Sequence, residues 1–373
     1  MNPSFALLDE RRRSLYTEAL SAARDVLEPL AAAGTPGKVN RDLLRALAGA
    51  LPSPVNAYGE VLPALDLCVI REALARHCTD AENAFALQGL GGFPIAAAGG
   101  AAVTERWLEP LSRGEAVAAF ALTEPQAGSD AAALSLSAEA DGDAFRLTGT
   151  KTFISNAPDA DVYTVFARTS AERTAGITAF AVAGDAAGLS GESLHLRGDH
   201  PIGTLHFDNV RVPVDCVLGE VGNGFTLAMQ TLDRFRPSVG AAAVGMGQSA
   251  LDDAIDHVET RTAFGGTLSR LQGVTHQLAD VATEVAAARL LVHAAAIAHD
   301  TGDAGVSQMS AMAKLFATET ASRAVDVAIQ VHGARALQRG HPLEHLSAVS
   351  RGTRIYEGAS EVQREIIARR LFR

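Results

Sequence analysis

The 373-residue chain has little of what disulfide scaffolds and zinc sites require. Its three cysteines, Cys68, Cys78 and Cys216, are odd in number and form no CxxC pair. A disulfide framework is therefore not expected, and a reducing, cytoplasmic location is predicted. The eleven histidines include no HExxH pattern, so no metal site is predicted.

The chain also lacks a long uncharged hydrophobic run and an excess of positive charge. No stretch of about eighteen apolar, uncharged residues occurs, so we expect no membrane span. The N-terminal segment carries charges where a signal peptide needs an apolar core, and it predicts an amphipathic helix. A formal net charge of −11 repels nucleic acids and anionic membranes, so neither is an expected partner.

Alanine and other apolar residues are abundant instead. Apolar residues make up 47% of the chain and aromatic residues only 5%, which allows a sizeable core and favours helix. The length predicts two or three packed regions. Residues 1–116 are predicted to be helical, with Asn40 as an N-cap, and residues 226–373 return to helix, with a C-cap at Gly333 and a last helix from about Ser360.

Short runs rich in Val, Ile, Thr, Phe and Tyr mark the middle of the chain as β-structure. They span residues 144–156, 161–169, 176–182 and 203–213, with turn residues between them. Strands and helices do not alternate, so a doubly wound sheet is disfavoured. The expected fold class is α+β: an N-terminal all-α domain (1–116), a middle antiparallel β-barrel or sandwich (117–225) and a C-terminal helical domain (226–373).

Residues Gly245 to Ala250 match the GxGxxA pattern of dinucleotide-binding folds. That pattern requires a strand before it and a helix after it. Here the preceding residues belong to an Ala-rich predicted helix. We therefore interpret the small residues as a place where two helices approach closely.

Two segments of the predicted β region have residue types that suit a ligand. Residues 120–130 (FALTEPQAGSD) end a strand in a loop whose hydroxyls and exposed N–H groups suit a pyrophosphate or a flavin edge. Residues 149–156 (GTKTFISN) predict a strand that could lie against a flavin ring. Taken singly, the first would be an ordinary strand-end turn and the second a core strand.

A third segment, residues 354–363 (RIYEGASEVQ), places Glu357 just before the last helix. Glu357 or Ser360 could simply cap that helix. Because Gln363 follows Ser360 at the spacing of a capping box, Ser360 is predicted to be the cap. This leaves Glu357 free for another role.

Together, residues 121–130 and 355–369 (IYEGASEVQREIIAR) resemble the acyl-CoA dehydrogenase family, and the match extends over nearly the whole chain in the family's order. The resemblance implies a helical domain, a β domain and a C-terminal four-helix bundle, with FAD as the cofactor and Glu357 as the catalytic base. The residues that it implies for flavin binding are Phe120, Leu122, Thr123, Gly128, Ser129, Phe153, Ile154, Ser155, Ala359 and Glu361.

The resemblance also assigns residues to the substrate and to a neighbouring subunit. Substrate contacts are implied for Ser129, Asp233, Arg236, Tyr356 and Gly358. Arg261, Phe264 and Gln272 match the pattern R-x-x-F-G-x-x-L-x-x-x-Q, which in the family holds FAD from the neighbouring subunit, and Gln330 and Gly333 match a second such segment. A homodimer or homotetramer is therefore implied.

The chain departs from the family pattern at several positions. The usual Gly-Gly-x-Gly is Gly333-Ala-Arg-Ala336, Ala348-Val349 replaces an Arg-Asp pair, and Ala359 replaces a threonine. These changes concern the surroundings of the flavin. Some branches carry the base near residues 229–236, but this chain has no glutamate there, which favours Glu357.

The implied reaction is FAD-dependent α,β-dehydrogenation of an acyl thioester of coenzyme A or acyl carrier protein to a trans-2-enoyl thioester. Glu357 removes the α-proton, the flavin N5 accepts a hydride, and an electron-transfer flavoprotein is the expected electron acceptor. One alternative is an oxidase or monooxygenase on the same fold that uses molecular oxygen. The other is a non-enzymatic, degenerate scaffold, which only the changes at Ala334 and Ala336 support.

Overall fold

The computed structural model describes residues 5, 8–198 and 200–372. The chain forms two compact units, which are described separately. The helical unit comprises Met1–Asp25, Pro63–Glu82 and Asp233–Arg373, and the sheet unit comprises Val26–Leu62 and Asn83–Leu232. The division into three domains at residues 116 and 225 stays a prediction.

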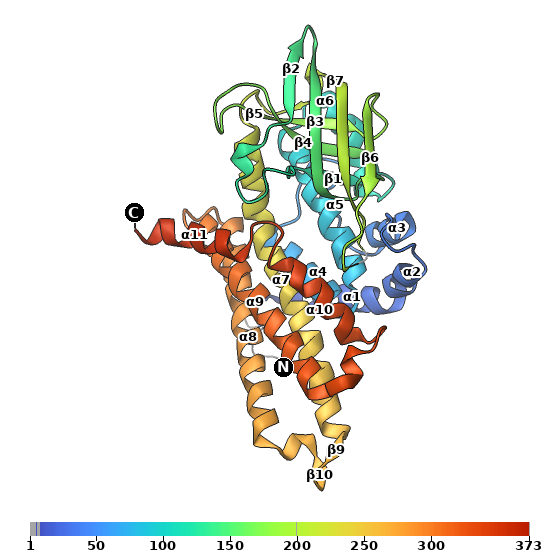
Figure 1. The fold of residues 1–373 in the computed structure, drawn as a ribbon, viewed down its shortest axis with the longest axis vertical. Coiled ribbons are helices and arrows are strands. Elements are labelled where there is room, and N and C mark those ends of the chain that lie inside the picture. The colour runs from blue at the N-terminus through green and yellow to red at the C-terminus, as the bar shows by residue number, and fades with distance from the viewer. Residues whose placement is uncertain (1–4, 6–7, 199, 373) are drawn as a thin grey trace. The chain divides into compact units, whose positions relative to one another are not determined.

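The helical unit consists of long helices joined by short loops (Figure 1). Its elements are α1 (Glu10–Ala22), α4 (Ala64–His77), most of α7 (Gly224–Thr260), β9 (Thr262–Ala263), β10 (Gly266–Thr267), α8 (Gln272–Asp300), α9 (Val306–His332), α10 (Pro342–Thr353) and α11 (Ser360–Leu371).

The long C-terminal helices predicted from the sequence are confirmed. Helix α9 ends with Gly333 as its C-cap at φ 64°, a left-handed conformation that glycine adopts without strain. The GxGxxA segment lies inside α7, as expected. A Cβ atom built on Gly245 would lie 2.3 Å from the Glu72 carbonyl oxygen of α4, so glycine permits this close helix–helix approach.

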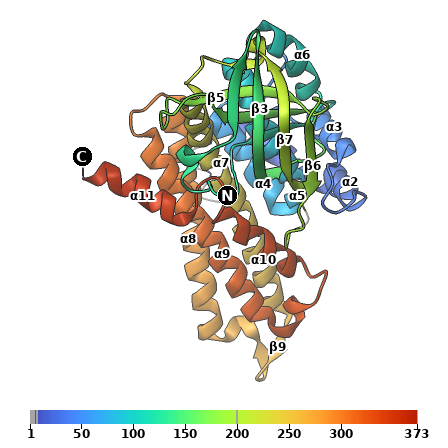
Figure 2. The ribbon, with the colours of Figure 1, turned by 45° about the horizontal axis from the view of Figure 1, so that its top comes forward.

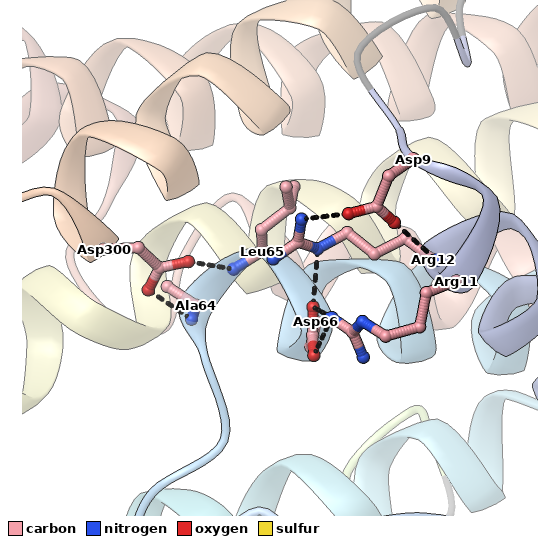
Figure 3. Close-up of polar contacts among 7 residues, drawn as sticks. All are labelled: Asp9, Arg11, Arg12, Ala64, Leu65, Asp66 and Asp300. Carbon is pink, nitrogen blue, oxygen red and sulfur yellow. Dashed lines mark hydrogen bonds and ion pairs between the residues drawn. The ribbon is translucent and has the colours of Figure 1, made fainter.

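The N-terminus of α4 is capped from another helix. Pro63, its N-cap residue, provides no side-chain hydrogen bond, and the backbone N–H groups of Ala64 and Leu65 instead donate to the Asp300 carboxylate at 2.6 and 3.0 Å (Figure 3). In the first turn, the buried Asp66 accepts hydrogen bonds from Arg11 and Arg12 of α1 (Figure 3). Negative charge at a helix N-terminus is stabilising, so both carboxylates anchor α4.

Helix α4 carries two buried charged side chains into the unit. Arg71 donates to Glu82 of α5 (Thr79–Ala98) at 2.6 Å and to the hydroxyl of Ser238 at 2.6 Å. Glu72 accepts from Arg289 of α8 at 2.7 Å. These pairs tie α4 to its neighbours, and they place the Arg71 guanidinium within the electrostatic environment of the loop before α11.

Within the described residues, α8 is the helix long and apolar enough to cross a membrane. Half of its most apolar window is buried inside the protein, and core helices of soluble proteins have the same composition. The finding is weak evidence for a span. The expectation that the chain has none is therefore unchanged.

The sheet unit is built around one eight-stranded sheet (Figure 2). Its helices are α2 (Glu28–Ala32), α3 (Arg41–Ala50), most of α5 and α6 (Ala101–Ser112), and its strands are β1 (Ala118–Ala121), β2 (Ser137–Asp141), β3 (Ala144–Ser155), β4 (Val162–Arg168), β5 (Ile177–Ala183), β6 (Leu189–Ser193), β7 (Ile202–Pro213) and β8 (Val217–Leu218). The predicted N-cap is confirmed, because the Asn40 side chain accepts from the Leu43 N–H.

The strand order is β6-β7-β3-β2-β4-β5-β8, with β1 paired to β4. The predicted strand runs are all present and most pairs are antiparallel, but β1 and β2 each pair with β4 in parallel. Side chains of β4 alternate between two apolar clusters, with Val165 in one and Phe166 in the other. Both faces of the sheet are therefore covered, which explains why β4 has no polar face.

Candidate functional site

The loop between α10 and α11 is a tight left-handed turn that contains Glu357 (Figure 1). Glu357 has φ 51° and Gly358 has φ 95°. The left-handed conformation costs a non-glycine residue about 1–3 kcal/mol and persists only where surrounding contacts fix it. Such strain is typical of functional sites, so Glu357 is an unusual residue for a mere connection.

Three side chains fix this turn through its carbonyl groups. Arg236 of α7 donates to the Glu357 carbonyl at 3.2 Å, and Lys314 of α9 donates to the Gly358 carbonyl at 2.7 Å. Gln363 of α11 donates to both carbonyls, at 3.3 and 2.9 Å. The turn is therefore held from three helices of the helical unit.

The Glu357 residue is half-buried, and its Oε2 atom is buried without a hydrogen-bond partner. Burial raises the pKa of Glu357, while the positive charges of Arg71, Lys314 and Arg236 act in the opposite direction. A carboxyl group with a raised pKa and an unpaired oxygen is suited to accept a proton from a bound ligand.

Other buried polar atoms around the same turn are unpaired. Among the described residues, six buried side-chain atoms lack a hydrogen-bond partner, and three of them are Arg354 Nε, Glu357 Oε2 and Gln363 Oε1. Unpaired buried polar atoms are rare in folded proteins and call for a water or a ligand. Their concentration at one turn favours this turn as a ligand-contacting site.

The prediction that Ser360 caps α11 is wrong. Ser360 is the first helical residue, Ala359 is the N-cap residue, and no side-chain cap bond forms. The Ser360 hydroxyl donates to Glu319 of α9 at 2.7 Å, because α9 offers it a carboxylate acceptor. Gln363 donates to the turn carbonyls instead of closing a capping box. Because α11 has no side-chain cap bond, Glu357 is not its cap either.

In the sheet unit, the segment after β1 forms an open loop. Leu122 is buried and Thr123 is half-buried, whereas Gly128 and Ser129 are exposed. A Cβ atom built on Gly128 would meet no heavy atom within 4 Å. The loop therefore leaves room for a flat or extended group beside its backbone, as flavin binding requires.

Strand β3 is irregular where the second ligand-binding segment was predicted. Its pairing with β7 shifts between Lys151 and Ile154, and the Thr152 N–H donates to the Thr123 carbonyl at 3.0 Å instead. Phe153 has φ 54° and is 56% exposed. A β-bulge re-aims side chains, and here it directs a large aromatic residue out of the sheet. Ile154 lies in the core, so its flavin contact stays a prediction, as does that of the half-buried Ser155.

A buried ion pair connects these two segments. The Lys151 ammonium is fully buried and donates to the Leu122 carbonyl at 2.9 Å and to the Glu124 carboxylate at 2.8 Å. Glu124 also accepts from the Ser135 N–H, the Ser135 hydroxyl and the Leu136 N–H. The pair thus holds the loop after β1 against β3.

Sequence analysis did not single out Lys151 or Lys314, although a lysine within an apolar strand or helix is an available signal. Burial lowers the pKa of Lys151 to about 8, and Glu124 only partly offsets this. For Glu124, burial is outweighed by Lys151 and by the backbone donors, so its pKa is lowered. Both pKa values are lowered, which disfavours the charged ammonium but favours the charged carboxylate, because the carboxylate has four donors and the ammonium only two acceptors.

The residues predicted to reach the FAD of a neighbouring subunit are exposed on the helical unit. Phe264, at φ 52°, lies in the turn between β9 and β10 and is 93% exposed. Arg261 and Gln272 flank that hairpin, and Gln330 and Gly333 end α9; all four are exposed. Exposure leaves them available to a partner, and their role stays a prediction.

The predicted substrate residues lie on several elements. Ser129 belongs to the sheet unit, while Asp233, Arg236, Tyr356 and Gly358 belong to the helical unit. Arg236 is buried and bonded to Asp233 at 2.8 Å as well as to the turn, whereas Tyr356 is 42% exposed. Phe120 is half-buried, and its ring centroid lies 4.9 Å from that of Phe166. Ala359 is the N-cap residue of α11, and Glu361 lies in its first turn.

Ligand atoms of Asp253, His332 and His341 lie within 4.8 Å of one another. His332 donates its Nδ1–H to the Ala328 carbonyl, which leaves Nε2 with a free lone pair. The Nδ1 atom of His341 already accepts from the Leu343 N–H, so its Nε2 carries the proton when the ring is neutral. This arrangement offers one free imidazole nitrogen, and the absence of a metal site stays a prediction.

Comparisons with known proteins give a consistent result. The family models for the acyl-CoA dehydrogenase middle domain and C-terminal domain match residues 119–210 and 222–372. Human mitochondrial short-chain specific acyl-CoA dehydrogenase is 38% identical over 332 residues, 87% of this chain and 80% of that protein. Cyclohexane-1-carbonyl-CoA dehydrogenase of Geobacter metallireducens is 37% identical over 311 residues, 82% of this chain and 81% of that protein.

Solved structures share the fold over nearly the whole chain. Butyryl-CoA dehydrogenase from Megasphaera elsdenii superposes with a TM-score of 0.91 at 31% identity, covering 98% of this chain and 99% of that one. PigA with FAD and proline gives 0.92 at 26% identity, covering 98% of each chain. The prolyl acyl carrier protein oxidase AnaB gives 0.88 at 25% identity, covering 98% and 99%. The chain therefore belongs to the acyl-CoA dehydrogenase family of FAD-dependent oxidoreductases.

Proposed function

We propose that this protein dehydrogenates an acyl-CoA thioester between its α and β carbons, giving the trans-2-enoyl thioester, with Glu357 as the base. The observation that carries this proposal is the buried, unpaired Oε2 atom of Glu357 on a left-handed turn. The two curated relatives named above are 37% and 38% identical and the butyryl-CoA dehydrogenase is 31% identical, whereas the carrier-protein enzyme AnaB is 25% identical. We therefore favour coenzyme A over a carrier protein.

Glu357 acts as a proton acceptor at the substrate α-carbon. A thioester α-proton is only weakly acidic, so the base must be held next to it, and its accepting oxygen must not already be engaged in an internal hydrogen bond. Both conditions are met by a carboxyl group whose backbone is fixed by Arg236 and Lys314 and whose Oε2 atom has no partner. Burial raises the pKa of Glu357 and so makes its carboxylate a stronger base.

The residues proposed to hold FAD fit the group. Around Gly128 there is open space, and Phe153 presents an exposed aromatic side chain next to the bulge in β3. The chemistry that FAD supplies when bound is acceptance of a hydride from the substrate β-carbon. Leu122, Thr123 and Ser129 border the same open loop and would position the cofactor.

Electron transfer to an electron-transfer flavoprotein, a homodimeric or homotetrameric state and a cytoplasmic location complete the proposal. The exposed Arg261, Phe264 and Gln272 support an assembly in which one copy contributes to the FAD site of another. These three statements are separable from the assignment of Glu357. Sedimentation of the FAD-loaded protein would measure the assembly directly.

The test is an anaerobic titration of the FAD-loaded protein with acyl-CoA thioesters of different chain lengths. The flavin absorbance should bleach with the wild-type protein and with Glu365→Gln, an exposed control on α11. Glu357→Gln should retain the flavin spectrum but not bleach. A Glu357→Gln protein that bleaches at the wild-type rate would refute the assignment, and peroxide formation in air would move the oxidase alternative ahead.

A further inference from the structure

Lys314 is a buried lysine in the middle of α9. Its neighbours Ala311, Ala313 and Ala317 are buried as well, so it lies in the buried part of the helix. Within the described residues no ion pair to Lys314 is present, and its hydrogen bond is to the carbonyl of Gly358. A buried ammonium without a carboxylate partner is unfavourable for folding, which suggests that another requirement keeps it there.

The carbonyl that Lys314 holds belongs to the residue directly after the proposed base. Its Nζ–O distance is 2.7 Å, shorter than the contacts of Arg236 and Gln363 with the same turn. Because peptide groups are planar, fixing the carbonyls of Glu357 and Gly358 fixes the two peptide planes that meet at Gly358. The first of these planes contains the Glu357 Cα atom, so the point from which the Glu357 side chain leaves the backbone is held.

We propose that Lys314 is a positioning residue for the Glu357 base, acting through the Gly358 carbonyl and through its positive charge. This inference rests on the function proposed above. Lys314 makes no contact with the reacting atoms in this assignment. It sets the geometry of the turn and the ionisation of Glu357.

The charge of Lys314 matters because it acts on a small set of charged groups around the turn. The charged groups that influence Lys314 are Glu357, Arg236 of α7, Glu319 of α9 and Glu361 of α11. Those that influence Glu357 are Arg71 of α4, Lys314, Arg236 and Glu82 of α5. Glu319 is already paired with Arg354 at 2.9 Å, and Glu357 is the charged group that acts most strongly on Lys314.

Lys314 therefore counteracts the effect of burial on the pKa of Glu357. Burial favours the protonated carboxyl, which is inactive as a base, and the ammonium favours the carboxylate. Burial also lowers the pKa of Lys314 to about 8. As the pH rises through this value, the cation beside Glu357 is lost and the charge-assisted bond to Gly358 weakens, so turnover should fall on the alkaline side.

A purely structural role predicts something different. A lysine that only fills space under the turn would affect folding and FAD content but not the pH dependence of proton removal. The two readings are therefore separated by pH profiles. Stability measurements alone would not separate them.

The experiment compares three lysine variants as FAD-loaded full-length proteins. Lys314→Met keeps the length of the side chain and removes the charge; replacing a buried charge by an apolar group is often neutral for folding. Lys314→Arg retains a charge that does not titrate in this range. Lys38→Met is the control, because Lys38 lies on the sheet unit with its ammonium near Ser193 and Asp159.

The rate of anaerobic flavin reduction is measured from pH 5 to pH 10. The acid limb is the part of the profile where the rate rises with pH as Glu357 loses its proton. In Lys314→Met the midpoint of this limb should move up by about one pH unit or more, since a nearby opposite charge lowers a carboxyl pKa by about that much. Below the limb the rate should be about tenfold lower than in the wild type. Lys314→Arg should keep the acid limb and lose the alkaline limb near pH 8. Lys38→Met should match the wild type.

A Lys314→Met profile that superimposes on the wild type after scaling would overturn the proposal. So would a Lys314→Arg protein that keeps the alkaline limb. If either Lys314→Met or Lys314→Arg does not fold, the change predicted for the pH profile of the other variant tests the proposal. An infrared difference titration of wild type minus Glu357→Gln reports the pKa of the Glu357 carboxyl without substrate. When it is repeated in the Lys314→Met background, this pKa should be higher than in the wild type.

The same set of proteins separates this inference from the proposed function. If the wild type is not reduced by any acyl-CoA, or if Glu357→Gln is fully active, the proposed function fails. The infrared titration still tests Lys314 in that case, because it does not depend on turnover. If Glu357→Gln is inactive and the Lys314 profiles do not move, the function stands and this inference fails.

Discussion

Replacing Lys151 by methionine should destabilise the sheet unit and reduce FAD binding together. The substitution removes the ammonium that bonds to the Leu122 carbonyl and to Glu124, and it leaves the Glu124 carboxylate buried. Because Lys151 connects the loop after β1 to β3, the predicted flavin-facing residues Thr123 and Phe153 lose their common support.

The size of the effect follows from what remains. Removing one partner of a buried ion pair costs about 3–5 kcal/mol because the other charge stays buried. Glu124 retains three donors, from Ser135 and Leu136, so the lower end, about 3 kcal/mol, is expected. The double variant with Glu124→Gln should be less destabilised than the sum of the single variants, with a coupling of about 1–3 kcal/mol.

The pH dependence of this loss has a definite sign. Because the pKa of Glu124 is lowered in the folded protein, its contribution is present above its unfolded value of about 4.3 and is lost as the pH falls through the folded value. Without Lys151 the folded pKa should rise. The gap to the unfolded value should therefore close, so the stability difference between Lys151→Met and the wild type should shrink as the pH falls below about 4.3.

The chain's single tryptophan, Trp107 of α6, provides the assay. It lies in the sheet unit, so urea unfolding followed by its fluorescence reports that unit, and flavin absorbance reports the FAD content. Lys38→Met serves as the control for losing a lysine elsewhere on the same unit. A cost below about 1 kcal/mol, or additive single and double variants, would refute the argument that the pair is coupled.

Two further predictions concern the packing and capping of α4. Gly245→Ala should lower the unfolding free energy by about 1–3 kcal/mol, because its Cβ would lie 2.3 Å from the Glu72 carbonyl oxygen. Gly49→Ala, in an open helix position, should instead raise the unfolding free energy by about 0.5–1 kcal/mol. Thermal melts followed by circular dichroism compare the two variants. Asp300→Ala should cost about 1 kcal/mol as a lost cap of Ala64 and Leu65. Burial raises the pKa of Asp300, but its hydrogen bonds outweigh this and lower the pKa. The stability difference between Asp300→Ala and the wild type should therefore be present above pH ~4 and vanish as the pH falls further. An Asp300→Ala protein that is equally destabilised at low pH would contradict this.

Local patterns in the sequence predicted the elements well where one physical preference dominates. The β-branched and aromatic runs became β3, β4, β5 and β7, and Asn40 and Gly333 occupy the caps that their residue types favour. Ser360 was the exception. Its capping box is a local pattern, but the carboxylate of Glu319 from another helix provided a better acceptor, which no local pattern reveals.

The site could be predicted to a similar extent. Loops with recognisable motifs identified Glu357, and the structure adds that its carboxyl group is buried with an unpaired oxygen. The side chains that fix those loops could not be found in this way, because Arg236, Lys314 and Lys151 come from elements far away in the sequence. Whether a buried charge has a partner is a property of the folded chain.

The distribution of lysine connects these observations. The chain has only three lysines, against many more arginines. Two of the three are buried, and each donates to a backbone carbonyl of a signature loop: Lys151 to Leu122 and Lys314 to Gly358. An ammonium is a compact point charge on a flexible stem, so it can reach a single carbonyl inside a packed core. One buried lysine thus holds a loop in each unit, and the two loops carry the proposed cofactor contacts and the proposed base.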